Sequence, residues 1–75
     1  MSPREEFESL FKELTNMSLN EAQVGEDGFV FVPPEVKLGE KDSVKRLRIS
    51  ELANHQWRNN LVDDDYAGWW IKPPA

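Results

Sequence analysis

The chain has no cysteine and only one histidine, His55, and these shortages exclude several kinds of site. Without cysteine there is no disulfide, no thiolate-bound metal and no cysteine nucleophile. Ser50 and Tyr66 are hydroxyls that could be activated by His55, but nothing nearby arranges a nucleophile, an orienting group and oxyanion donors together. A surface histidine is the simpler interpretation. We therefore predict a protein that is not an enzyme and has no cofactor.

Long apolar runs are also missing. No segment approaches the length of a signal-peptide core or a membrane-spanning helix. Together with the absence of cysteine, this leads us to expect a cytoplasmic protein with no membrane attachment. The 75 residues predict one domain over 1–75, close to the size at which a single core is barely sufficient. Large apolar side chains should then be needed inside, namely Phe7, Phe11, Phe29, Phe31 and Trp57.

Basic side chains are outnumbered and unevenly placed. Nine lysines and arginines against 14 aspartates and glutamates give a net charge of −5. Residues 1–28 have a net charge of −5, residues 29–50 of +2 and residues 51–75 of −2. Nonspecific nucleic-acid affinity comes largely from cations set against phosphates, so this balance argues against it. A protein partner with a basic or mixed surface is favoured.

The start of the chain has the pattern of an amphipathic helix. Ser2 can cap it, Pro3 suits the first helical position, and Glu5 completes a capping box. An apolar stripe follows at i, i+3, i+4 and i+7, made of Phe7, Leu10, Phe11 and Leu14. The spacing predicts a helix that ends near Thr15 or Asn16.

The next segments alternate turn and strand signals. Ser18 and Glu21 repeat the capping-box spacing, which favours a helical turn, although a short strand over 22–24 stays open. Residues 25–28 read Gly-Glu-Asp-Gly and predict a turn. Phe29 to Val32 are aromatic and β-branched and are followed by two prolines. We predict a strand there, central in its sheet because both faces are apolar.

The second half is less regular. An extended piece over 35–38 and a turn over 39–43 precede a predicted strand over 44–49. A helix from the cap Ser50 to Asn59 and a final strand over 69–72 follow. The predicted fold is α+β: two helices packed on a short, mostly antiparallel three-stranded sheet.

An acidic run invites a calcium interpretation. Asp63, Asp64 and Asp65 start a stretch that reaches Gly68 at the sixth position of an EF-hand loop. The fifth position is Ala67 and the twelfth, where a bidentate glutamate is required, is Pro74. We predict a solvated acidic loop and no metal.

Lys45, Arg46 and Arg48 make the one basic cluster that the sequence suggests as an anion site. On a strand, Arg46 and Arg48 would project from one face and could hold phosphate or carboxylate. This gives an alternative hypothesis of nucleic-acid or phosphate-ligand binding. The acidic N-terminal helix could instead supply partners within the chain.

The aromatic end of the chain supplies the main hypothesis. On a strand, the adjacent Trp69 and Trp70 must point to opposite faces, so one of them lies outside the core, under a loop, on a second layer or on a partner. Tryptophan and tyrosine dominate interface hot spots. We predict a small acidic regulator, inhibitor or accessory subunit. Its partner-binding residues would be Tyr66, Trp69 and Trp70 with an acidic rim of Asp63, Asp64 and Asp65.

Two further possibilities follow from the same features. The acidic N-terminal helix and the three aspartates could imitate a polyanion and block a nucleic-acid enzyme. The final strand could pair with its own copy, so monomer and homodimer both stay open.

Overall fold

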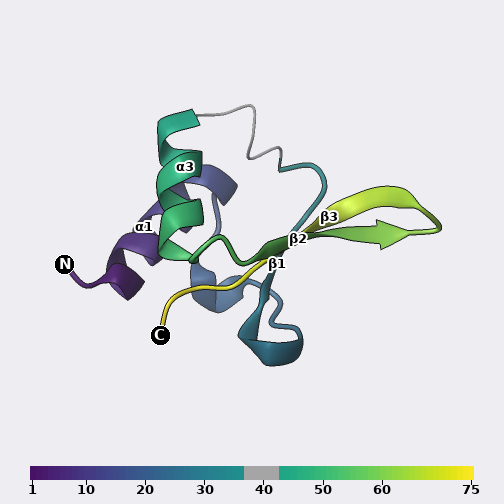
Figure 1. Cartoon of the computed structure of the whole chain (residues 1–75). Coiled ribbons are helices and arrows are strands. Elements are labelled where there is room, and N and C mark those ends of the chain that lie inside the picture. Colours follow the sequence, from purple (N-terminus) through teal and green to yellow (C-terminus); the bar gives the residue numbers. More distant parts are fainter. Residues whose placement is uncertain (37–42) are drawn as a thin grey trace.

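Two α-helices lie together at one end of the molecule, and a β-hairpin projects from the other (Figure 1). The computed structural model describes residues 1–36 and 43–75. Its elements are α1 (Pro3–Thr15), η1 (Leu19–Glu21), η2 (Glu26–Gly28), β1 (Val30–Val32), α3 (Ser43–Leu52), β2 (Trp57–Val62) and β3 (Asp65–Ile71). The strands form an antiparallel sheet in the order β1-β3-β2. The predicted α+β class, with two helices and three strands, is confirmed.

Helix α1 forms as its sequence predicts. The Ser2 hydroxyl accepts the Glu5 backbone N–H at 3.2 Å, and the Glu5 carboxylate accepts the Ser2 N–H at 3.1 Å. Hydrogen bonding of the Glu5 carboxylate to Ser2, first to its backbone N–H and then to its side chain, lowers the pKa of Glu5. Asn16 ends the helix in the left-handed region at φ 62°. The capping box therefore fixes the start of α1 and directs its apolar stripe inward.

The core lies between the two helices and the inner face of the sheet. Its buried apolar residues are Phe7, Phe11, Leu14, Leu19, Ala22, Val30, Val32, Ile49, Ala53 and Ile71. Each large buried side chain stabilises the fold by about 1.5–3 kcal/mol. Three aromatics expected inside are not fully buried: Phe29 and Phe31 are half-buried, and Trp57 is 45% exposed. The prediction that nearly all large apolar groups lie inside is confirmed for Phe7 and Phe11 and was wrong for Trp57.

Strand β1 is an edge strand and not the central one, which corrects the prediction for residues 29–32. Its outer side is covered by the preceding segment. Phe31 N–H donates to the Gln23 carbonyl at 2.9 Å, and Gly25 N–H donates to the Phe29 carbonyl at 2.7 Å. Both faces of β1 are apolar because Val30 and Val32 face the core while Phe31 packs on Trp70.

The predicted strand over 44–49 and helix over 50–59 were both wrong. Helix α3 occupies Ser43–Leu52, and β2 begins at Trp57. Lysine, arginine, leucine and glutamate favour a helix here, and Ile49, Leu52 and Ala53 fall at i, i+3 and i+4 toward the core. Asn54 and His55, at φ 55° and 57°, then turn the chain into β2.

The remaining local predictions are mostly confirmed. The turn at Ser18 is η1, and residues 25–28 form the turn of η2. The final strand is present as part of the longer β3. The expected extended piece over 35–38 begins instead as a turn, in which Val36 N–H donates to the Pro33 carbonyl at 3.0 Å. The rest of that piece, and the turn over 39–43 except Ser43, lie outside the described residues.

Candidate interaction surface

The three aspartates form the tip of the β2–β3 hairpin. Asp63 and Asp64 both have positive φ, at 53° and 67°, as a two-residue hairpin turn of type I′ requires. Aspartate tolerates this region better than most residues. All three side chains are exposed. Within residues 1–36 and 43–75, no group of three His, Cys, Asp or Glu side chains is placed to hold a metal ion.

A β-bulge sets the direction of the side chains behind the tip. Asn59 pairs with Trp69 and Leu61 with Tyr66, so Asn60 alone stands opposite two residues of β3. Gly68, one of these two, has φ 108°. The extra residue shifts the alternation of β3 by one position. As a result, Tyr66 lies on the same face as Leu61 and Trp69.

Trp69 and Trp70 point to opposite faces, as strand alternation predicts. The Trp69 ring stacks on Trp57 on the inner face, with centroids 5.1 Å apart and planes 23° apart. Trp70 packs on Phe31 on the outer face, at a centroid distance of 5.1 Å. Both indoles are half-buried. Neither is the solvent-facing tryptophan that could have marked a partner surface by itself.

The outer side of Trp70 is closed by the η2 segment. A Cβ on Gly25 would lie 2.5 Å from the Trp70 ring, so the backbone at Gly25 contacts the indole directly. Next to this contact, the Arg58 guanidinium lies 4.7 Å from the centroid of the Phe29 ring. This cation–π contact and the covering segment make Trp70 a packing residue of the outer face.

The inner face is more open. An apolar groove of about 200 Å³ lies between α3 and the sheet. Its lining is Arg46, Leu47, Ile49, Ser50, Trp57, Trp69 and Ile71. The Nε of Arg46 is buried and has no hydrogen-bond partner among the described residues. A drug-sized ligand needs about 300–1,000 Å³, so the groove suits single side chains better than a free small molecule.

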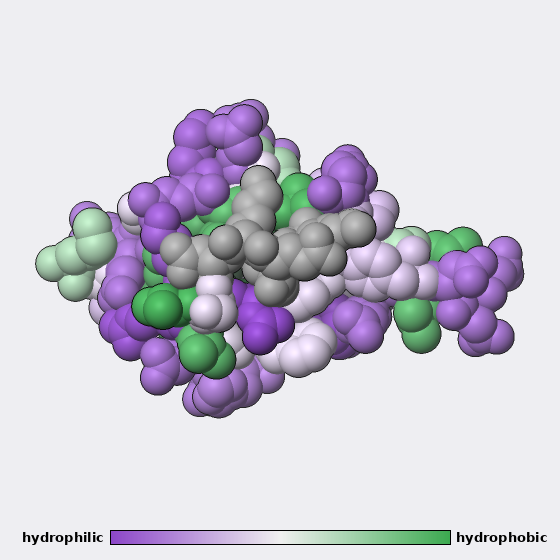
Figure 2. All heavy atoms as spheres, turned by 90° about the horizontal axis from the view of Figure 1, so that it is seen from above, coloured by the Kyte–Doolittle hydropathy of each residue, from purple (hydrophilic) through white to green (hydrophobic). Residues whose placement is uncertain are grey.

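Beyond the groove, the inner face continues to the hairpin tip. We use the term hairpin face for the surface formed by four residues of the inner face, Trp57, Leu61, Tyr66 and Trp69. Trp57 and Tyr66 are each 45% exposed and Leu61 is 58% exposed. Figure 2 shows apolar side chains beside the hydrophilic end of the projecting hairpin. The tip thus joins an exposed apolar surface to an acidic rim, formed by Asp63, Asp64 and Asp65.

The sequence identified only half of this surface. Trp57 and Leu61 were placed on a helix, where their spacing of four residues suggested burial. In the structure they alternate with Asn59 along β2. The sequence signal that could have revealed Trp57 and Leu61 as surface residues was their alternation with Asn59 along a strand. This strand pairs with a second strand that is rich in aromatic residues.

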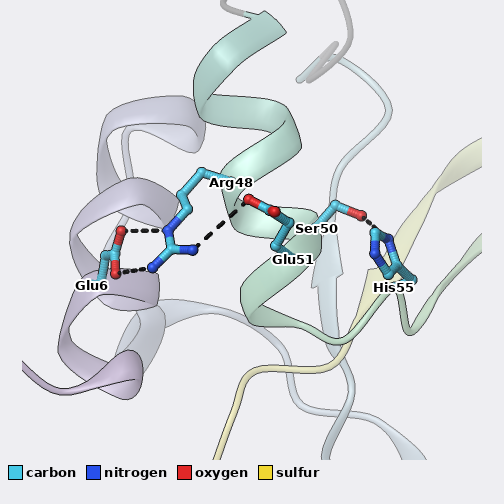
Figure 3. A network of polar contacts seen from close by, with 5 residues as sticks. All are labelled: Glu6, Arg48, Ser50, Glu51 and His55. Carbon is cyan, nitrogen blue, oxygen red and sulfur yellow. Dashed lines mark hydrogen bonds and ion pairs between the residues drawn. The ribbon is translucent and has the colours of Figure 1, made fainter.

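The basic cluster is not on a strand and does not form one face. Lys45, Arg46 and Arg48 lie on α3. Arg48 holds Glu6 of α1 through two hydrogen bonds of 2.7 and 2.8 Å, shown in Figure 3. The hydrogen bond with Arg48 lowers the pKa of Glu6, and the same bond raises the pKa of Arg48. The Lys45 ammonium lies 3.7 Å from a carboxylate oxygen of Glu13.

The predicted helix over 50–59 contained His55, but in the structure His55 follows the end of α3 and lies outside it. Its Nδ1 lies 3.2 Å from the Ser50 hydroxyl (Figure 3), and its backbone N–H donates to the Ser50 carbonyl at 2.8 Å. The two contacts join the same pair of residues at the end of the helix. These contacts between Ser50 and His55 therefore cap the C-terminus of α3.

Comparison of the chain with protein-family models, with curated proteins and with solved structures finds no match. Among the helices of the described residues, none has the length and apolar character needed to cross a membrane.

Proposed function

We propose that the chain is a non-enzymatic interaction protein, a small regulator, inhibitor or accessory subunit that binds a protein partner through the β2–β3 hairpin. One observation supports this most directly. A chain of only 75 residues leaves three large apolar side chains of the hairpin face substantially exposed, namely Trp57, Leu61 and Tyr66. Contiguous exposed apolar surface rimmed by polar residues is typical of interaction sites.

The residues of the surface take different parts in this proposal. Tyr66 is the anchor, because its ring is exposed and its hydroxyl can form a hydrogen bond with a partner. Trp69 is on the same face as Tyr66 but is half-buried, so it supports the packing behind the anchor. Trp70 holds the hairpin from the outer face through Phe31. The acidic rim steers basic or mixed partners toward the anchor.

The test is affinity capture from native extract at low and moderate salt. The wild-type protein is compared with a double variant, Leu61→Ser with Tyr66→Ser, and with Val24→Ser as a control. Val24 is 65% exposed but belongs to the segment beside β1, so its replacement removes apolar surface elsewhere. Circular dichroism checks that all three fold alike. We expect the hairpin variant alone to lose the captured protein; equal capture by both variants would overturn the proposal.

Nucleic-acid or phosphate-ligand binding by Lys45, Arg46 and Arg48 is the weaker alternative. Arg48 and Lys45 are directed at carboxylates of α1, at Glu6 and Glu13. This alternative predicts oligonucleotide affinity that falls steeply with salt and is lost in Arg46→Ala with Arg48→Ala. Polyanion mimicry by the acidic rim predicts a different result, which is competition with DNA for a basic protein that weakens when the three aspartates become asparagines.

A further inference from the structure

The two edges of the sheet are not equivalent. The outer edge of β1 is hydrogen bonded to the segment of Gln23 to Gly25. In the described part of the chain, no backbone hydrogen bond reaches β2 from any element other than β3. An unpaired edge is a template for another strand. Edges are commonly protected by proline, charged side chains, bulges or short length. Strand β2, with sequence WRNNLV, is six residues long and has no proline or lysine, and its one charged side chain, Arg58, packs on the Phe29 ring.

The bulge also leaves this edge intact. Its extra residue lies on β3, where Ala67 and Gly68 stand opposite Asn60. Strand β2 therefore keeps an uninterrupted alternation, with Trp57, Asn59 and Leu61 on the inner face. Its free edge runs for about 20 Å at the usual rise per residue.

We propose that the occupant of this edge is a second copy of the chain, with β2 pairing antiparallel to β2 of the partner about a two-fold axis at Asn59. The two sheets then join into one. This inference rests on the proposed function of the hairpin face, and it identifies a second copy of the chain as the partner that covers that face.

Strand alternation determines where the axis can lie. A two-fold axis perpendicular to the sheet keeps the inner faces of both copies on one side, so paired residues must share a face. The axis must then pass through a residue and not between two. At Asn59 it sets Trp57 opposite the partner's Leu61, and Leu61 opposite the partner's Trp57. Such aromatic–aliphatic pairs stabilise antiparallel strands.

The neighbouring registers are worse. An axis at Arg58 places two guanidinium groups directly opposite each other, and like charges in that position are destabilising. An axis at Asn60 moves Trp57 opposite the partner's Asp63 and Leu61 opposite the partner's Asn59. Apolar side chains would then face polar ones. Of the three registers, only the one centred on Asn59 brings the two exposed apolar residues on the inner face of β2, Trp57 and Leu61, opposite each other.

The groove becomes part of the same interface. Antiparallel pairing lays the partner's hairpin tip beside the base of β2, where Trp57 and Leu47 border the groove. The partner's Leu61 comes beside Trp57 on the inner face, and the partner's Tyr66 lies one strand further away on the same face. The partner's acidic rim comes toward the side of the groove where Arg46 lies. The tip is acidic, whereas Arg58 of β2 and Arg46 of α3 lie near the base of the hairpin, so the two ends are complementary in charge.

A single-cysteine variant tests both the association and its register, because the natural chain has no cysteine. At the two-fold axis, opposing Cα atoms lie about 4.5–5.5 Å apart. That distance suits a disulfide. Asn59→Cys should form a covalent dimer rapidly on mild oxidation, whereas the exposed control Glu26→Cys on η2 should not. Faster cross-linking by Asn60→Cys than by Asn59→Cys would overturn the register.

Sedimentation of the unmodified protein tests the association without a thiol. We expect a monomer–dimer equilibrium between micromolar and millimolar concentrations, with the dissociation constant raised about tenfold or more in Leu61→Asp, as for an interface anchor. A wild-type protein that stays monomeric, with no selective cross-linking at residue 59, overturns self-association. The proposed function fails separately, if the hairpin double variant captures the same proteins as wild type.

Discussion

The indole N–H of Trp70 donates to the side-chain oxygen of Asn60 at 3.2 Å, across the bulge of the β2–β3 hairpin. The amide nitrogen of Asn60 donates in turn to the Ala67 carbonyl at 3.0 Å. One asparagine side chain therefore satisfies the bulge carbonyl and the polar atom of a half-buried tryptophan. Asparagine is disfavoured in strands, and these two bonds are the reason that it is placed here.

Replacement of Asn60 should weaken the fold. We expect Asn60→Ala to lower the free energy of unfolding by about 1–2 kcal/mol, because it leaves the indole N–H and the Ala67 carbonyl without their partner. Asn59→Ala, at an exposed site on the same strand, should change it by less than about 0.5 kcal/mol. Urea unfolding followed by circular dichroism in dilute solution measures both. Equal losses in the two variants would contradict the role given to Asn60.

Two glycines with positive φ should respond very differently to alanine. A Cβ on Gly68 would lie 2.6 Å from the Val32 carbonyl oxygen and 2.7 Å from the Phe31 ring, whereas a Cβ on Gly28 would have no atom within 4 Å. Gly28→Ala should cost about 1 kcal/mol, for the left-handed conformation alone. Gly68→Ala adds the clash with the backbone of β1 and should cost at least about 2–3 kcal/mol. The difference in melting temperature between the two variants tests the close approach of β1 and β3.

The Glu6–Arg48 contact predicts acid sensitivity. Since hydrogen bonding to Arg48 lowers the pKa of Glu6 below 4.5 in the folded protein, the unfolded chain binds this proton more readily. The contribution of Glu6 to stability is complete above its unfolded pKa and is lost as pH falls through the folded value. Glu6→Gln should therefore show a smaller loss of stability on acidification below pH 4.5 than wild type. A stability curve of Glu6→Gln that falls as steeply as that of wild type over this range would contradict the role given to the Glu6–Arg48 contact.

Tryptophan quenching should distinguish the three indoles. Trp57 is the most exposed of them, at 45%, whereas Trp69 and Trp70 are half-buried. In dilute solution, Trp57→Phe should remove most of the emission accessible to acrylamide, which is neutral and does not respond to the net charge. At high concentration, pairing of β2 should protect Trp57 in the wild-type protein. Quenching that is independent of concentration would contradict the proposed burial of Trp57.

The first third of the fold could be predicted because its signals are local. Ser2, Glu5 and the apolar stripe of α1 lie within one segment and all indicate a helix. The η1 and η2 turns were likewise predictable from capping and glycine signals close in sequence. The segment of α3 was mistaken for a strand because its inward stripe is short and Val44 and Leu47, on the same helix, are exposed. Tertiary contacts of Ile49 and Ala53 determine that helix, and these contacts are not visible locally.

The candidate surface was predictable only in part for a related reason. Strand alternation was enough to send Trp69 and Trp70 to opposite faces. The neighbours of each tryptophan depend on β2. This strand was not predicted, because its two central asparagines suggested the end of a helix. The bulge at Gly68 and the bonding of Asn60 arise only when β2 and β3 meet, so the position of Tyr66 beside Leu61 required the structure.

The covered edge of β1 has a consequence for the size of any assembly. Association through β2 uses the open edge of each copy, and the joined sheet then ends on both sides at a β1 strand already bonded to residues 23–25. Within residues 1–36 and 43–75, this pairing leaves no open strand edge of the sheet for a third copy. If the proposed pairing of β2 forms, growth should stop at two chains and filaments should not form.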